Sequence, residues 1–424
     1  MKKLELHWQI LIAILLAALA GSLTGTDAGI AGVSFYAIYN FVGTLFLNAL
    51  SMIVVPLVMA SIIVGVASLG SGDDLGRLGL KTLGYYTLTT FLAILVGLVL
   101  VNLLHPGVRD GVPVGADMNL TLDQGELSGA LARVEGRGGA DIAAIFIRMI
   151  PTNVIAAAAQ GEMLGMIFFS LVFGYFMTRI PARQAEVLLV FWQGVAETMM
   201  KITMWIMCFA PLGVFGLVAR TIAATGFSAF MPMLLFFITV LLALLLHTFG
   251  VLWALLKFVG RVNPVKHFLA MMPALLTAFS SASSNATLPL SMECLQKNVG
   301  VSERTTSFVL PLGATVNMDG TALYECVAAI FLAQAYGLEL SFATQFTVVL
   351  LALLTSIGVA GIPAASLVAI TVILTAIGLP VQAIGLLLVT DRVLDMFRTS
   401  VNIYSDSCCA VIVARAEGEK DLLV

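Results

Sequence analysis

Five charged or amide side chains near the C-terminal end of the chain recur at helical spacing. They are separated by 4, 3, 4 and 4 residues and are Asp391, Asp395, Arg398, Asn402 and Asp406. At about 100° per residue they form one stripe roughly 80° wide and about 22 Å long. Apolar sequence flanks the stripe, and a charge at membrane depth costs on the order of 3 kcal/mol unless it faces a cavity or a partner. The pattern indicates a helix lining a binding site, with acids for cations and an arginine for an anion. The alternative is a helix end at the membrane surface.

A second polar stretch, PLGATVNMDGT at residues 311–321, interrupts an apolar segment. Pro311, Gly313 and Gly320 would interrupt a helix there and free backbone carbonyls. Asn317 and Asp319 add side-chain oxygens. Several oxygens with one carboxylate suit a hard monovalent cation such as Na⁺. The alternative is a kinked helix in which Asp319 is paired elsewhere.

Three hydroxyl side chains, Tyr86, Thr89 and Thr90, share one face of the helix expected over 79–104. Their spacing of i, i+3 and i+4 places them next to one another. Taken alone, this pattern favours hydroxyls that bond back to carbonyls of their own helix.

Glu325 follows Thr321 by about one turn in the apolar segment TALYECVAAIF. A lone carboxyl in such a helix is a candidate proton carrier. The alternative is a neutral, hydrogen-bonded core glutamate.

The composition indicates the class of protein to which these polar groups belong. The chain has 424 residues, of which 60% are hydrophobic and 11% charged, and a mean hydropathy of +1.04. These values indicate a polytopic membrane protein. The net charge is −3 and no basic tail or patch suggests nucleic-acid binding. The five cysteines lie in or beside apolar runs without metal-ligand spacing and are predicted to be core residues.

Six apolar runs in the first part of the chain predict spans near 8–25, 34–69, 79–104, 143–178, 185–222 and 227–258. The first is predicted to be an uncleaved span rather than a signal peptide. The fourth is broken by residues 151–153 and 160–162, so we expect it to be segmented. The polar stretch 105–141 is predicted to be a loop outside the core.

Two later segments have the pattern of re-entrant hairpins. Residues 268–279 precede SSASSNATLP, and residues 342–357 precede GVAGIPAAS, so each apolar arm meets a break with a proline, Pro289 or Pro363. A longer polar helix follows each of them, over 303–336 and 381–415. Paired interrupted segments of this kind are typical of a transporter's binding site, and the helix N-termini at the tips could hold a carboxylate. The alternative is two kinked helices.

The distribution of basic residues predicts the orientation. With the N-terminus inside, eight spans and two hairpins place most of the 21 lysine and arginine residues in the cytoplasm, among them Lys81, Lys257 and Lys420. Both termini are then cytoplasmic.

These motifs together resemble the dicarboxylate/amino acid:cation symporter family. The resemblance covers nearly the whole chain and is carried by MIVVPLVMASIIVGVASLG, SSASSNATLP, PLGATVNMDGTALYE, TSIGVAGIPAAS and DRVLDMFRTSVNIYSDS. It implies an all-α membrane protein with eight transmembrane helices, two re-entrant hairpins, inverted repeats and an elevator mechanism. The implied scaffold comprises residues 1–75 and 110–222, and the implied transport domain comprises 76–109 and 223–424. Members of the family are homotrimers in the cell membrane.

The resemblance also implies roles for individual residues. Asp395 matches the aspartate that binds the substrate's amino group, and Arg398 matches the arginine that binds its side-chain carboxylate. Ser284 and the backbone of the second hairpin are implied to hold the α-carboxylate. The other implied substrate contacts are Ser283, Thr321, Gly358, Val359, Ala360, Gly361, Thr399 and Asn402.

Up to three Na⁺ sites are implied, and no organic cofactor. The first consists of Asp406 with backbone of Gly313, Asn317 and Asn402. The second consists of backbone of Thr315, Ser356, Ile357 and Val359, near the Met318 sulfur. The third consists of Tyr86, Thr89, Thr90, Asn317 and Asp319.

The implied function is Na⁺-coupled uptake of L-aspartate or L-glutamate. Relatives that carry neutral amino acids lack the arginine at Arg398, and carriers of C4-dicarboxylates without an amine lack the aspartate at Asp395; both classes remain the alternatives. Archaeal Na⁺-only members carry glutamine at Glu325, whereas the proton- and potassium-coupled mammalian members carry glutamate, so proton co-transport and K⁺ return are also implied. A channel has little use for paired amine and carboxylate ligands, and no HExxH or GxSxG motif indicates an enzyme.

Overall fold

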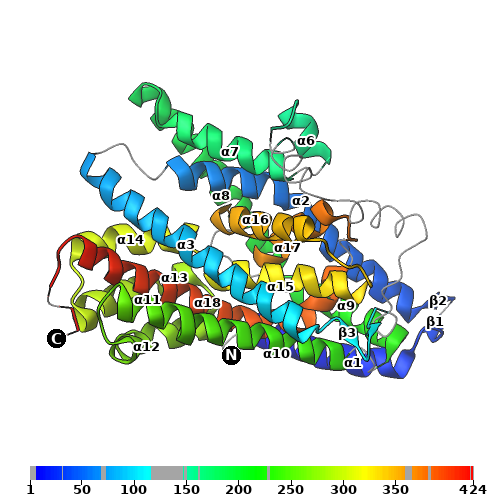
Figure 1. Cartoon of the computed structure of the whole chain (residues 1–424). Coiled ribbons are helices and arrows are strands. Elements are labelled where there is room, and N and C mark those ends of the chain that lie inside the picture. Colours follow the sequence, from blue (N-terminus) through cyan, green and yellow to red (C-terminus); the bar gives the residue numbers. More distant parts are fainter. Residues whose placement is uncertain are drawn as a thin grey trace, which may run out of the picture.

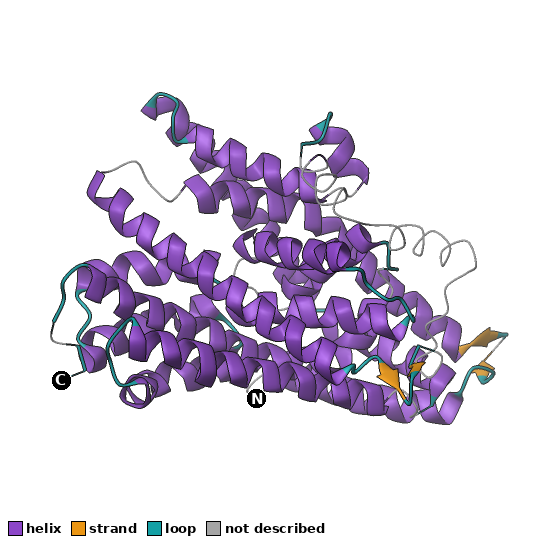
Figure 2. Cartoon of the chain, in the orientation of Figure 1, coloured by secondary structure: helices purple, strands orange, loops and turns teal. Residues whose placement is uncertain are grey.

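The computed structural model describes residues 6–30, 32–67, 73–115, 147, 150–160, 163–226, 230–358, 365–380, 383–420 and 422–423, and most of these residues are helical (Figures 1 and 2). The first helices are α1 (Leu6–Thr24), α2 (Phe35–Ala67), α3 (Asp73–Leu104), α6 (Val154–Gln160), α7 (Met163–Met177), α8 (Ala182–Met207) and α9 (Ala210–Thr225). They are followed by α10 (Phe230–Leu246), the π-helix η2 (His247–Leu252), α11 (Trp253–Phe258), α12 (Pro264–Ser281), α13 (Ser284–Cys294) and the π-helix η3 (Leu295–Val299). The last are α14 (Glu303–Val316), α15 (Asp319–Ala335), α16 (Phe342–Gly358), α17 (Ala365–Ile377) and α18 (Ile384–Ala416).

Two short antiparallel hairpins accompany the helices. Strand β1 (Gly29–Ile30) pairs with β2 (Val33–Ser34), and β3 (Val108–Arg109) pairs with β4 (Val112–Pro113). Residues 108–113 belong to the stretch predicted as a loop, and most of the remainder, 116–141, lies outside the described residues.

Three of the described helical segments are long and apolar enough to cross a membrane, and they are Leu78–Leu104, Met231–Phe258 and Glu303–Ala335. Where the sequence predicts one span over 185–222, α8 and α9 meet at a bend of 55°. Pro211 lies in the first turn of α9, and its missing N–H explains why a helix begins there rather than continuing from α8. The run over 143–178 is segmented as predicted, since α6 ends at Gln160 and α7 begins at Met163.

The first predicted hairpin consists of α12 and α13, which pack against each other. The chain reverses at Ala282, whose φ of 49° is left-handed, and the side chain of Ser283 then caps α13 by accepting from Ala286 N at 3.3 Å. The prediction that a proline marks this break is wrong, because Pro289 lies inside α13. In the second hairpin α16 ends at Gly358 and α17 begins at Ala365, and the two helices pack together. The predicted break residue Pro363 lies outside the described residues.

The helix over 303–336 is broken as predicted, but the break lies at residues 317–318, whereas Pro311 and Gly313 lie inside α14 and Gly320 lies in the first turn of α15. Helix α14 ends at Val316, Asn317 and Met318 have extended backbone with φ of −106° and −119°, and α15 begins at Asp319. In contrast, α18 is one uninterrupted helix of 33 residues that carries the whole stripe of polar side chains. The break and the stripe are brought together because both α14 and α15 pack against α18.

Helix α15 forms the centre of the bundle, with nearly every side chain buried. It packs against α3, α10, α16, α17 and α18, and Figure 1 shows α3 crossing beside α15 and α18. Helix α2 instead packs mainly against α7, α8 and α9, and α1 packs against α9. Four of the five cysteines are buried as predicted, whereas Cys208 is exposed.

Candidate functional site

The guanidinium of Arg398 is fully buried and held by groups from three helices. Its Nη2 lies 2.9 Å from Asp391 Oδ1 and 3.0 Å from Asp395 Oδ1, both on α18. Its Nη1 donates to Ser366 Oγ on α17 at 2.8 Å. Its Cζ lies 4.0 Å from the centre of the Tyr324 ring on α15. In the structure Asp391 is therefore paired with Arg398.

Arg392 completes a closed group of charges. Its Nη1 lies 3.4 Å from Asp395 Oδ2, so Asp395 contacts both arginines. We call Asp391, Arg392, Asp395 and Arg398 the charge quartet. Two acids and two bases sum to zero when all four are ionised, which is how buried charges are tolerated. These four side chains are buried within the bundle, as expected for a helix that lines a site.

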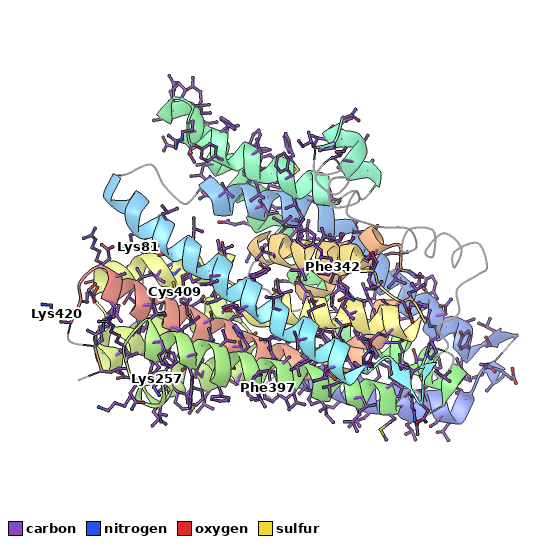
Figure 3. The ribbon with its side chains drawn as sticks, viewed as in Figure 1. Lys81, Lys257, Phe342, Phe397, Cys409 and Lys420 are labelled. Atoms are coloured by element: carbon purple, nitrogen blue, oxygen red, sulfur yellow. The ribbon has the colours of Figure 1, made fainter. Side chains whose placement is uncertain are left out.

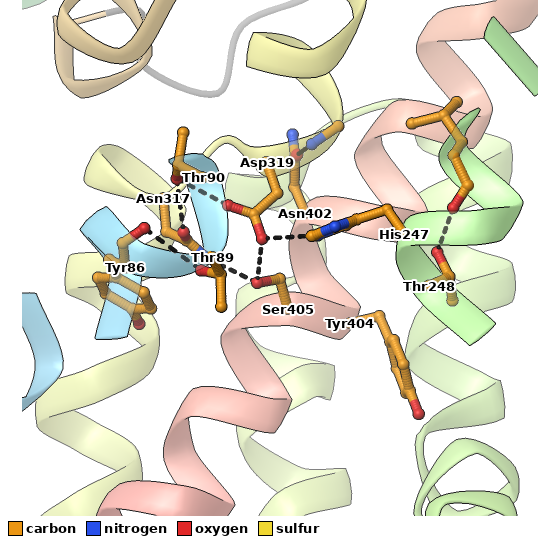
Figure 4. A network of polar contacts seen from close by, with 12 residues as sticks. Tyr86, Thr89, Thr90, His247, Thr248, Asn317, Asp319, Asn402, Tyr404 and Ser405 are labelled. Atoms are coloured by element: carbon orange, nitrogen blue, oxygen red, sulfur yellow. Dashed lines mark hydrogen bonds and ion pairs between the residues drawn. The ribbon is translucent and has the colours of Figure 1, made fainter. Parts of the chain in front are cut away.

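A second cluster surrounds the carboxylate of Asp319, which is fully buried (Figure 4). Thr90 Oγ1 donates to Asp319 Oδ1 at 2.7 Å and lies 3.3 Å from Asn317 Oδ1. Ser405 Oγ donates to Asp319 Oδ2 at 2.6 Å, and His247 Nε2 lies 3.1 Å from the same oxygen. Three oxygens, from Thr90, Asn317 and Asp319, thus converge at the break between α14 and α15, an arrangement that can hold a hard cation.

Asp406 lies beside the same break. Its Oδ1 accepts from Asn317 Nδ2 at 2.8 Å. The backbone of Gly313 passes so close that a Cβ there would collide with the Asp406 carboxylate and with the hydroxyl of Tyr86. Gly313 therefore leaves a small space bounded by a carboxylate, a phenol oxygen and the end of α14. Hard-cation chemistry fits this donor set, because every group in it is an oxygen.

The three hydroxyls on α3 differ in whether they donate hydrogen bonds within their own helix or to other segments. Thr89 Oγ1 donates to the carbonyls of its own helix, Tyr85 O at 3.2 Å and Tyr86 O at 3.3 Å. Tyr86 OH donates to Val309 O on α14 at 2.8 Å. Of the three, only Thr90 donates to Asp319. The local bonding that the pattern favours holds for Thr89 and not for the other two.

Asn402 connects the stripe to the broken helix. Its Oδ1 accepts from Gly320 N at 2.8 Å, and its Nδ2 lies 3.2 Å from both Thr321 Oγ1 and Met318 Sδ. Thr399, by contrast, donates to Asp395 O on its own helix at 2.8 Å. A Cβ on Gly320 would meet the backbone of Arg398, so this glycine is what allows α15 to begin against α18.

The remaining predicted residues lie in the two hairpins. Ser283 caps α13, and Ser284 is buried in its first turn. Ser356 is buried in α16 and donates to Leu353 O at 2.8 Å. For Thr315 and Ile357 the structure describes only the helical backbone, and Gly358 is the last described residue of α16. Val359, Ala360 and Gly361 lie outside the described residues.

A model of the sodium:dicarboxylate symporter family matches residues 6–416. The chain belongs to this family.

Curated relatives in the sodium:dicarboxylate symporter family share about a third of the residues. The proton/glutamate-aspartate symporter of Escherichia coli is 34% identical over 99% of this chain and 94% of its own length. The proton/sodium-glutamate symport protein of Bacillus caldotenax is 35% identical over 99% of this chain and 96% of its own. The mouse excitatory amino acid transporter 3 is 34% identical over 96% and 85%.

Glu325, the candidate proton carrier, is fully buried on α15. Its Oε2 accepts from Thr355 Oγ1 on α16 at 2.8 Å. Its Oε1 has no hydrogen-bond partner among the described residues. One free carboxyl oxygen is what a group that gains and loses a proton requires.

Four side chains of the site were not predicted from the sequence. They are His247, Tyr324, Thr355 and Ser405. His247 carried a signal, because it is a lone histidine in the apolar run 227–258, and it is buried against a carboxylate. Ser405 directly precedes Asp406 and lies at about 100° from it around the helix, so the spacing of the stripe does not include it. Its partners come from the broken helix, whose path the sequence does not give.

Proposed function

We propose that this chain is a secondary active symporter that couples an inward Na⁺ gradient to the uptake of L-aspartate or L-glutamate. The observation that carries the proposal is the pairing of Arg398 with Asp395 in one buried cluster. An α-amino diacid presents a carboxylate to the arginine and an ammonium to the aspartate. The names of the relatives, glutamate and aspartate symporters, support the same substrates.

Substrate binding in this site is an exchange of ion pairs. Arg398 is already satisfied by Asp391, Asp395 and Ser366. The side-chain carboxylate of the substrate takes over Nη atoms from these oxygens, and the substrate's ammonium replaces the guanidinium at Asp395. Buried charge therefore stays paired before and after binding, which avoids a penalty of several kcal/mol per ion. A neutral amino acid has no side-chain carboxylate to replace the oxygens that Arg398 gives up, so it gains less from the exchange.

The oxygen clusters at Asp319 and Asp406 are the proposed sites for the transported Na⁺ ions. Thr90, Asn317 and Asp319 supply the first, with Tyr86 and Thr89 nearby on α3. Asp406 supplies the second, with the backbone of Gly313, Asn317 and Asn402. A third Na⁺ site, at Thr315, Met318, Ser356, Ile357 and Val359, is proposed from family resemblance. Hydroxyl and carbonyl oxygens beside a single carboxylate match a singly charged ion.

We also propose the architecture of the family for this chain, in the cell membrane with cytoplasmic termini. It comprises eight spans, two re-entrant hairpins and three copies, with a transport domain (76–109 and 223–424) moving against a scaffold (1–75 and 110–222). The two helical hairpins and the broken helix between them support this proposal. So does Figure 3, where Lys81, Lys257 and Lys420 all lie at one end of the bundle.

Competition uptake tests the substrate. In proteoliposomes with an imposed Na⁺ gradient, we expect labelled aspartate uptake to be inhibited by unlabelled aspartate and glutamate and not by malate or serine. Inhibition by serine would favour a neutral amino acid carrier, and inhibition by malate a C4-dicarboxylate carrier. Accumulation that does not depend on Na⁺ would overturn the coupling.

Glu325→Gln tests proton coupling. The substitution keeps the hydrogen bond to Thr355 and removes the ionisable oxygen. We expect the variant to bind aspartate with Na⁺ and to lose the stimulation of uptake by an imposed inward pH gradient and by internal K⁺. Glu339→Gln, at an exposed acid beyond the end of α15, is the matched control. Uptake driven by Na⁺ alone and equal in both variants would show that Glu325 carries no proton.

A further inference from the structure

The two proposed cation sites share one side-chain amide. Asn317 Oδ1 faces Thr90 at 3.3 Å, on the Asp319 side, while its Nδ2 donates to Asp406 Oδ1 at 2.8 Å. The two ends of an amide are fixed relative to each other. The orientation that suits a cation beside Asp319 is thus the same one that directs an N–H toward Asp406.

Ser405 closes this amide into a ring (Figure 4). Its Oγ accepts from Asn317 Nδ2 at 3.1 Å and donates to Asp319 Oδ2 at 2.6 Å. Thr90 completes the other side, since its hydroxyl contacts both Asp319 and Asn317. The path from one acid to the other runs from Asp406 through Asn317 and Ser405 to Asp319. The four side chains of this path and that of Thr90 are all buried, so within the described residues no solvent-exposed group interrupts the path.

The members of the ring come from elements that are far apart in the sequence. Thr90 is on α3, Asn317 lies at the break, Asp319 begins α15, and Ser405 is on α18. His247, on η2, lies 3.1 Å from Asp319 Oδ2, the oxygen that also accepts from Ser405. With Oδ2 held by two groups, Asp319 can turn only Oδ1 toward a cation. Two members contact both Asn317 and Asp319 through a single rotatable hydroxyl, Thr90 from α3 and Ser405 from α18, and Ser405 is the one that lies next to Asp406 in the chain.

We propose that Ser405 is a positioning residue that couples the two cation sites. A cation held by Asp319 and Asn317 fixes the orientation of the Asn317 amide. Through its hydrogen bonds to Asn317 and Asp319, Ser405 then holds α18 in place, and with it Asp406 at the second cation site. The second ion then binds to a site that is already ordered, which is positive cooperativity by preorganisation. This inference rests on the proposed Na⁺-coupled function and adds to it the order and coupling of ion binding.

The test is the Na⁺ dependence of aspartate binding, measured by calorimetry on the purified full chain over a series of Na⁺ concentrations. In Ser405→Ala we expect the Hill coefficient for Na⁺ to fall toward 1 and the Na⁺ midpoint to rise by roughly fivefold or more. At saturating Na⁺ the variant should bind aspartate with affinity close to the unmodified chain, because Ser405 makes no contact with the charge quartet among the hydrogen bonds of the described residues.

Ser407→Ala is the matched control. Ser407 lies two residues along α18 and is equally buried, but its hydroxyl bonds to His267 and Tyr404 O, outside the ring. It should leave the Hill coefficient unchanged. If Ser405→Ala does not fold, Ser405→Cys keeps the volume with a weaker donor and should lower the Hill coefficient by less. An unchanged Hill coefficient and midpoint in the Ser405 variant, with cooperative Na⁺ dependence in the unmodified chain, overturns the coupling alone. No Na⁺ dependence in the unmodified chain overturns the symport proposal with it.

Discussion

Replacing Arg398 by alanine should lower the affinity for aspartate by about two to three orders of magnitude. The side chain is the proposed anchor for the substrate's carboxylate, and removing one partner of a buried ion pair costs about 3–5 kcal/mol, with each 1.4 kcal/mol worth a factor of ten. The variant also leaves Asp391 without the arginine it contacts at 2.9 Å. Calorimetric titration with aspartate and with serine, at saturating Na⁺, measures the effect, and aspartate should lose far more affinity than serine.

Arg392→Ala is the control for this experiment. Arg392 has the same charge, lies six positions earlier on α18 and contacts Asp395 at 3.4 Å, but it is not proposed to bind substrate. We expect a loss of tenfold or less. Equal losses in the two variants would mean that the total charge of the cluster matters rather than the contact made by Arg398. An unchanged aspartate affinity in Arg398→Ala would refute the substrate assignment.

Gly313→Ala should weaken the Na⁺-dependent binding of aspartate, so that at least tenfold more Na⁺ is needed. The added methyl group would occupy the space between the Asp406 carboxylate and the Tyr86 hydroxyl, where the second cation is proposed to bind. Alanine suits the helical backbone that α14 already has, so any loss of folding stability would come from this collision and not from the backbone. The expected readout is a Na⁺ midpoint raised at least tenfold, and the melting temperature measured without Na⁺ gives the separate cost of the collision to folding.

Gly84→Ala is the matched control for Gly313→Ala. Gly84 is also a helical glycine, on α3 two residues before Tyr86, and nothing within 4 Å meets an added Cβ. It should bind Na⁺ and aspartate normally and gain a little stability. A Na⁺ midpoint in Gly313→Ala equal to that of Gly84→Ala would exclude the proposed cation site at Asp406.

Most of the helical order could be predicted from hydropathy, because a membrane span is a long local pattern. The break at Asn317 and the reversal near Ser283 were also predictable, since short polar residues interrupt the apolar sequence at both. The position of a turn within such a stretch depends on backbone geometry. Ala282 takes the left-handed conformation while Pro289 stays helical, a choice that side-chain type alone does not determine.

The candidate site was predictable where its residues share one helix. The stripe from Asp391 to Asp406 is periodic, and α18 carries it as expected. Contacts between helices were not predictable in the same way. Asp319 contacts Ser405 on α18 and His247 on η2 because these elements pack around the break. The spacing of residues in the sequence does not predict that packing. For the same reason the hydroxyl of Thr90 could not be distinguished from that of Thr89.

The charge quartet has a consequence for the proposed movement of the transport domain across the membrane. A unit charge carried through a potential of 100 mV gains or loses about 2.3 kcal/mol. With all four groups ionised, Asp391, Arg392, Asp395 and Arg398 sum to zero, so the proposed movement of this cluster would contribute almost no net electrical work. The electrical sensitivity of the proposed cycle is then expected to come from Asp319, Asp406 and the ions they hold, together with the proposed proton carrier Glu325. Currents carried by the substrate-free protein would report on those three acids, while the four charges of the quartet would be electrically silent.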